Sequence, residues 1–145
     1  MPKKKKEIDA RFSKFGTVSF ARVTQVNDFI DFLEKGKLMG TRCKKSGRSF
    51  FPPRAQCFES LSSDMEWFEV TGNGKLVSFS TLKYAPTGFK DDLPYTIALL
   101  DYGNYQVFGR IDSSIPEEEL SVGMEMKTVV TKTANQQLTY VFDRD

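Results

Sequence analysis

The sequence contains no histidine and only two cysteines among its 145 residues. Histidine is the commonest general base near neutral pH, so its absence excludes a Ser-His-Asp or Cys-His nucleophile system within this chain. No apolar run approaches the roughly 20 residues that span a bilayer. The lysines at residues 3–6 are not followed by the apolar segment of a secretory signal. We therefore expect a cytoplasmic protein without a membrane partner, in which both cysteines stay reduced.

The charges divide the chain into two halves of opposite sign. Residues 1–60 contain 14 Lys and Arg against 6 Asp and Glu, whereas residues 61–145 contain 7 against 13. A basic first half indicates an anionic partner, which includes the phosphates of a cofactor, a nucleic acid or an acidic protein surface. The acidic second half argues against nucleic acid, which usually requires a basic groove.

The residue pattern predicts a mainly β protein in three parts. Residues 1–26 are interpreted as an extended basic arm, which docks aromatic side chains on a surface. Residues 27–64 are interpreted as a short helix, which ends at Gly36, followed by two short strands around the cysteines. Residues 65–145 alternate between apolar segments and Gly or Asn turns, which is typical of a five-stranded OB-fold barrel.

The two cysteines have the spacing of a zinc ribbon in which half of the ligands are missing. A zinc ribbon binds its metal through two Cys-x-x-Cys turns, but here the turns are Cys43-x-x-Ser46 and Cys57-x-x-Ser60. Cys43 and Cys57 are therefore the candidate ligands of a degraded metal site, and a complete zinc site is not expected. Three alternatives stay open: a metal-free ribbon with two buried thiols, residual metal binding completed by Glu59 or water, and a disulfide, which a reducing compartment disfavours.

Further residues around these turns resemble a known family. The resemblance covers about residues 28–131, and its most specific part is Pro-Pro-Arg between the spaced cysteines. It is carried by Leu38, Gly40, Arg42, Cys43, Gly47, Phe50 or Phe51, Pro52, Pro53, Arg54, Cys57, Trp67, Thr71, Gly72 and Gly74, then by Leu93-Pro94-Tyr95 and Leu120-Ser121-Val122-Gly123-Met124. The segment resembles the DUF35 family of acyl-CoA-associated proteins, which join a rubredoxin-like zinc ribbon to an OB-fold barrel.

The resemblance implies a non-catalytic accessory subunit of a thiolase or acyltransferase-type enzyme. Such a subunit would dock on a thiolase-like large subunit in a hetero-oligomer and share its coenzyme A thioester. The candidate contacts to the phosphates of coenzyme A are the five basic residues Arg42, Lys44, Lys45, Arg48 and Arg54. These residues are equally compatible with a solvated turn surface, and the alternative functions are a nucleic-acid-binding ribbon/OB module and a free-standing acyl-CoA binder or hydrolase.

Overall fold

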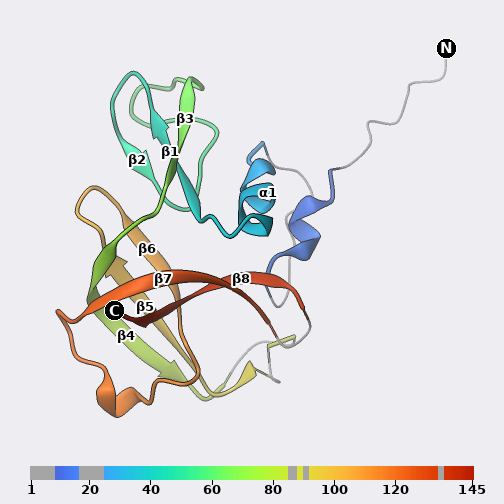
Figure 1. Ribbon diagram of the computed structural model, residues 1–145. Helices are drawn as coiled ribbons and strands as arrows, with labels where there is room; N and C mark the ends of the chain where they lie inside the picture. Colours follow the sequence, from blue (N-terminus) through green and yellow to red (C-terminus); the bar gives the residue numbers. More distant parts are fainter. Residues whose placement is uncertain (1–8, 17–24, 85–87, 90–91, 134–135) are drawn as a thin grey trace.

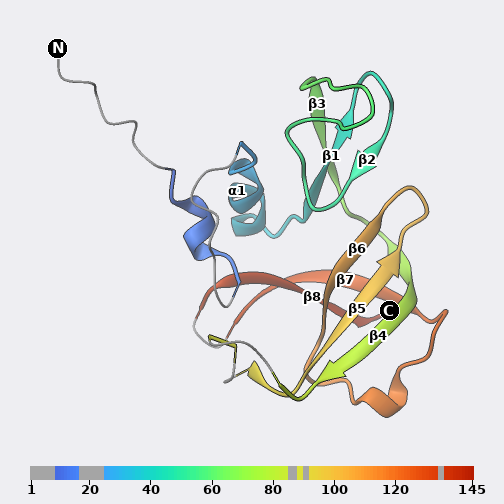
Figure 2. The same ribbon diagram turned by 180° about the vertical axis from the view of Figure 1, so that it is seen from behind.

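The computed structural model describes residues 9–16, 25–84, 88–89, 92–133 and 136–145. A small ribbon sheet stands beside helix α1, and both lie on the same side of a β-barrel (Figures 1 and 2). The elements in chain order are η1 (Arg11–Lys14), α1 (Asp28–Glu34), β1 (Met39–Cys43), β2 (Ser49–Phe50), β3 (Met65–Glu69), β4 (Asn73–Leu82), β5 (Tyr95–Asp101), β6 (Gln106–Ile111), η3 (Glu117–Glu119), β7 (Glu125–Lys132) and β8 (Leu138–Arg144).

Helix α1 forms where the sequence predicts it, because its apolar residues recur on one side. Phe29, Ile30 and Leu33 are buried, and they belong to the main hydrophobic core. Gly36 follows the helix with a φ of 78°, a left-handed conformation that glycine adopts without steric cost. Among the described residues, no helix has the length and apolar character needed to cross a bilayer.

The five strands from β4 to β8 close into the predicted barrel, in the order β4-β5-β6-β8-β7. All the pairings are antiparallel except that of β6 with β8, which is parallel. Alternate residues point inward, and their largest fully buried side chains are Leu76, Leu100, Val107, Met126 and Phe142. This arrangement confirms the fold class predicted from the sequence.

The ribbon is a three-stranded sheet in the order β2-β1-β3. Strand β3 pairs with β1 along its whole length, from Met39 opposite Glu69 to Cys43 opposite Met65. It therefore belongs to the ribbon sheet, whereas residues 65–69 are predicted from the sequence to begin the barrel. The difference has a physical reason, because β3 alternates only in part and the sequence does not show that its pairing partner is β1 of the ribbon.

Aromatic side chains connect the ribbon, α1 and the barrel. Phe51 of the ribbon lies edge-on to Tyr140 of β8, with ring centroids 5.6 Å apart. The rings of Phe68 and Tyr105 are 4.9 Å apart, so β3 also contacts the loop between β5 and β6. The ribbon is therefore anchored by apolar packing as well as by its own sheet.

The described part of the predicted basic arm packs on its own chain. Residues 11–14 form a 3₁₀-helix, which differs from the extended conformation expected for residues 1–26, of which residues 1–8 and 17–24 lie outside the described residues. The ring of Phe12 stacks on Phe29 with centroids 5.9 Å apart. The guanidinium of Arg11 lies 2.8 Å from Asp28 and 2.6 Å from Asp31. These contacts place the segment against α1.

Candidate functional site

The ribbon contains two turns with matching backbone hydrogen bonds, one after each cysteine. The Cys43 N–H donates to the carbonyl oxygen of Arg48, and the Cys57 N–H donates to that of Ser62, both at 2.9 Å. Each turn also has a left-handed residue four positions after its cysteine, Gly47 at a φ of 72° and Leu61 at 57°. The second turn therefore repeats the first, although its left-handed residue is not a glycine.

The side chains of the two turns meet in a group of four, which we call the Cys/Ser quartet: Cys43, Ser46, Cys57 and Ser60. Each thiol contacts the hydroxyl of the opposite turn. Cys43 Sγ lies 3.2 Å from Ser60 Oγ, and Cys57 Sγ lies 3.4 Å from Ser46 Oγ. The backbone N–H of Ser46 also donates to Cys43 Sγ at 3.4 Å. Both cysteines are fully buried and free.

Hydrogen bonds within the quartet favour the ionised form of the thiols. The Ser46 hydroxyl and, after it, the Ser60 backbone N–H lower the pKa of Cys57 to about 6, against an opposing effect of burial. Hydrogen bonds from the Ser46 hydroxyl and backbone N–H also lower the pKa of Cys43. The hydrogen-bond donors of the quartet therefore stabilise negative charge on sulfur, as a metal ion does in a zinc ribbon.

The donor set of the quartet does not fit a structural zinc ion. Such sites use four ligands, nearly always thiolates and imidazoles, and a serine hydroxyl remains protonated near neutral pH. Among the described residues, no group of three or more Cys, Asp or Glu side chains could hold a metal ion. Glu59, the expected additional ligand, is ion-paired with Arg48 at 2.8 Å.

Three of the five predicted coenzyme A contacts are paired with acidic residues of the ribbon. Their partners are Glu66 for Arg42 at 3.9 Å, Asp64 for Lys44 at 3.5 Å and Glu59 for Arg48 at 2.8 Å. All three pairs are about half exposed, so each contributes little to stability. They nevertheless reduce the positive charge that the sequence pattern indicates for this surface.

The other two predicted contacts, Lys45 and Arg54, have no ion-pair partner within the described part of the chain. Arg54 stacks over the rings of Phe50 and Phe58, at 5.6 and 5.7 Å from their centroids. Arg48 lies over the same Phe58 ring at 4.9 Å, so the structure brings Arg48 and Arg54 together. Lys45 is exposed in the turn between Cys43 and Ser46.

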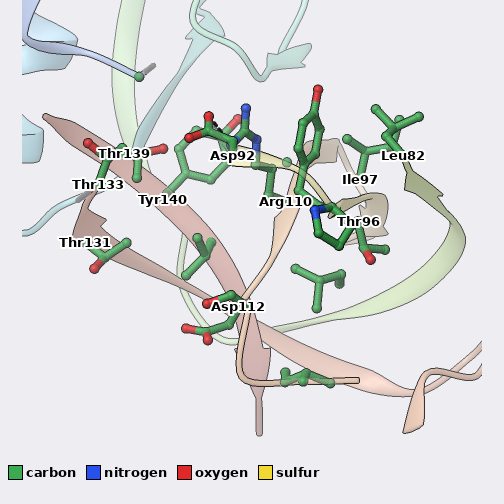
Figure 3. Close-up of a pocket in the computed structure, with 18 of the residues that line it drawn as sticks. Leu82, Asp92, Thr96, Ile97, Arg110, Asp112, Thr131, Thr133, Thr139 and Tyr140 are labelled. Carbon is green, nitrogen blue, oxygen red and sulfur yellow. Dashed lines mark hydrogen bonds and ion pairs between the residues drawn. The ribbon is translucent and has the colours of Figure 1, made fainter. Parts of the chain in front are cut away.

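A groove of about 890 Å³ on the barrel was not predicted. Figure 3 shows Arg110 and Asp92 beside each other in this groove, where they form an ion pair at 3.0 Å. The Arg110 guanidinium also lies 4.0 Å from the ring centroid of Tyr95. The pairing of β5 with β6 creates this contact. The separate aromatic and basic residues are visible in the sequence, but their juxtaposition depends on strand register.

Acidic side chains balance the positive charge in the groove. Asp92, Asp112 and Glu117 line it together with Arg110 and Lys132. Burial raises the pKa of Tyr140 at its edge, so this hydroxyl stays protonated and donates to the Phe108 carbonyl oxygen at 2.6 Å. A groove of this charge does not favour a polyanion such as nucleic acid.

These features define a protein with a zinc-ribbon backbone joined to an OB-fold barrel. Residues 31–66 match the family described as the ChsH2 rubredoxin-like zinc ribbon domain, and residues 67–132 match the ChsH2 C-terminal OB-fold domain. A DUF35 domain-containing scaffold protein of Pyrococcus furiosus is 32% identical over 101 residues, which are 70% of this chain and 74% of the relative. The chain belongs to the DUF35 family, as its sequence motifs predict.

Two further similarities involve proteins of enzyme complexes. The benzoylsuccinyl-CoA thiolase subunit BbsA of Thauera aromatica is 31% identical over 93 residues, covering 59% of this chain and 63% of that subunit. The structure of an Ltp2-ChsH2(DUF35) aldolase contains a chain that aligns with a TM-score of 0.68 and 20% identity. The alignment covers 83% of this chain and 94% of the other, and it supports the fold.

Proposed function

We propose that this chain is a non-catalytic accessory subunit of a thiolase-type enzyme. The observation that carries the proposal is its similarity to BbsA, which is itself a thiolase subunit. The fold similarity to a chain of the Ltp2-ChsH2(DUF35) aldolase structure agrees with a subunit role. An accessory role also agrees with the sequence, which has no histidine to serve as a catalytic base.

The two thiols are poorly placed for catalysis, which supports a role for the partner in the chemistry. Cys43 and Cys57 are fully buried, and each is hydrogen-bonded to a serine of the opposite turn. A catalytic nucleophile needs access to substrate, and a thiolase-type reaction also needs a base. We therefore assign both groups to the large subunit. The buried free thiols also support the cytoplasmic location that we propose.

The ribbon surface has the composition of an interaction site. Phe58 and Leu61 are 57% and 72% exposed. Arg48 and Arg54 flank Phe58 and stack on its ring. Aromatic side chains and arginine are enriched where proteins associate, so we propose this surface as a contact with the large subunit.

Affinity purification tests the subunit role. A tagged copy of the chain is purified gently from its native host, and the associated proteins are identified by mass spectrometry. The proposal predicts a thiolase-type large subunit in near-equal amount, and F58A is expected to reduce its recovery. V122A is a matched control because Val122 is a similarly exposed apolar residue on the barrel. Recovery of the chain alone, or of nucleic acid whose binding falls steeply with salt, would overturn the proposal.

We also propose that Lys45 and Arg54 contact the phosphates of the acyl-CoA substrate in the complex. The support is their charge, because neither has an ion-pair partner among the described residues, whereas Arg42, Lys44 and Arg48 do. The test compares the KM for acyl-CoA in complexes that carry K45A, R54A or the control K83A. Lys83 is an exposed lysine on the barrel. The proposal predicts a several-fold higher KM for the first two variants, and a KM unchanged by either would contradict it.

A further inference from the structure

The family that residues 31–66 match is described as a zinc ribbon, yet the quartet of this chain has only two of the four thiolates that such a site uses. We propose that hydrogen bonds within the Cys/Ser quartet replace the metal ion in this chain, so that the ribbon folds without zinc. We propose further that the two turns keep the backbone geometry of a zinc site, so that converting both serines to cysteine restores metal binding. This inference is independent of the proposed function.

The first argument is the arrangement of the contacts. A tetrahedral site with zinc–sulfur bonds of ~2.3 Å holds its sulfur atoms about 3.8 Å apart. In the quartet, the sulfur-to-oxygen distances between the turns are 3.2 and 3.4 Å. The four side chains therefore already converge from both turns. A small outward movement would accommodate two additional sulfur atoms around one metal ion.

The second argument is the backbone of the turns. Each cysteine N–H donates to the carbonyl oxygen five residues later, and each turn has a left-handed residue after its serine. The Ser46 N–H donates to Cys43 Sγ, which is a contact typically made to a thiolate in a metal-binding turn. Both turns keep this geometry although neither has its second thiol. The chain's own hydrogen bonds and left-handed residues therefore define the backbone of both turns.

The third argument is the support around the quartet. The serine hydroxyls also accept hydrogen bonds from the chain that follows, from the Arg48 N–H at 3.2 Å and the Ser62 N–H at 3.3 Å. The two thiols form a separate small core with Phe50, against which Met65 packs. Each hydroxyl is therefore fixed by a backbone donor while it contacts sulfur. A metal-free quartet held in this way leaves no buried quartet atom without a partner.

The metal content of wild-type and S46C/S60C protein tests both parts of the proposal. Both are expressed in zinc-supplemented medium and measured by elemental analysis after purification. We expect close to no zinc in the wild type and about one zinc per chain in the double variant. Cobalt(II) added to the apo double variant should give the intense visible bands of a tetrahedral thiolate site. S78C/S121C is the matched control, because it adds two cysteines at exposed barrel positions and should stay metal-free.

Thermal unfolding with a chelator provides a second readout. Chelation should leave the Tm of the wild type unchanged and lower that of the double variant. About one zinc per chain in the wild type, or a wild-type Tm that falls with chelator, would overturn the metal-free ribbon. A folded double variant without zinc would overturn the retained site. If the double variant does not fold, cobalt spectra of S46C and S60C decide: thiolate bands in either support the retained site, and their absence in both overturns it.

Discussion

Thr41 provides the sharpest test of how the ribbon is held together. This residue of β1 is only 2% exposed, and its hydroxyl donates to the Arg54 carbonyl oxygen and accepts from the Arg54 N–H, both at 2.8 Å. Valine has the same shape without the hydroxyl, so T41V removes both bonds. Each is worth about 1 kcal/mol net, and the unpaired backbone groups of Arg54 add a desolvation cost. We therefore expect a loss of about 2–3 kcal/mol in the free energy of unfolding.

The assay is urea unfolding with a chelator present, followed by the fluorescence of the single tryptophan. Trp67 lies on β3 within the ribbon and packs against Phe32, with ring centroids 5.2 Å apart. T41S is the control, because it keeps the hydroxyl and loses one methyl group, which costs about 1 kcal/mol. A T41V variant no less stable than T41S would show that these two hydrogen bonds do not stabilise the ribbon.

Three further measurements test other parts of the structure. Leu61 has a φ of 57°, so L61G should raise the unfolding free energy by about 0.5–1 kcal/mol in urea titrations, and a loss would contradict backbone strain. The pKa of Cys57 is about 6 when folded, against ~8.5 for a free thiol, so the thiolate's contribution to the free energy of unfolding should grow as the pH rises from 6 to 8.5 and be absent below 6. Thiolate absorbance should then titrate near pH 6, and titration near 8.5 would contradict the lowered pKa. A Cβ at Gly40 would lie 2.5 Å from the Phe50 carbonyl oxygen, so G40A should lower the free energy of unfolding by about 2 kcal/mol. An unfolding free energy equal to that of the wild type would contradict this close packing.

The family and the fold class could be predicted because their signals are local. The Pro-Pro-Arg between the two cysteines and the apolar spacing of α1 depend only on neighbouring residues. The same is true of the turn that leads from the ribbon into the barrel and of the turn between β5 and β6, where Gly72 and Gly103 have positive φ angles. Alternation of apolar residues then determines which side of each strand is buried. These features predict the five-stranded barrel without knowledge of its pairing.

The details of the candidate site depend on contacts between distant segments, which a single sequence does not contain. The acidic partners of Arg42 and Lys44 are Glu66 and Asp64, and they meet because β3 aligns beside β1. The stacking of Arg110 on Tyr95 similarly requires β6 to pair with β5. The basic residues are therefore visible in the sequence, but which of their charges are already paired depends on the fold.

The 3₁₀-helix η1 within the predicted arm shows the same dependence on distant residues. Phe12 and Phe15 are three residues apart, which is compatible with a helical turn and with an extended segment. The ion pairs of Arg11 with Asp28 and Asp31 favour the 3₁₀-helix, and these partners come from α1. Short helices depend on such tertiary contacts because they are marginally stable alone.

We propose that this chain assists a catalytic large subunit and does not itself catalyse the reaction. The most direct test is to measure acyl-CoA thiolysis by the purified chain, by the purified large subunit, and by the two mixed in equal amounts. We expect no turnover by the chain alone, and a higher rate for the mixture than for the large subunit alone. Turnover by the chain alone, or a large-subunit rate that does not change when the chain is added, would contradict it.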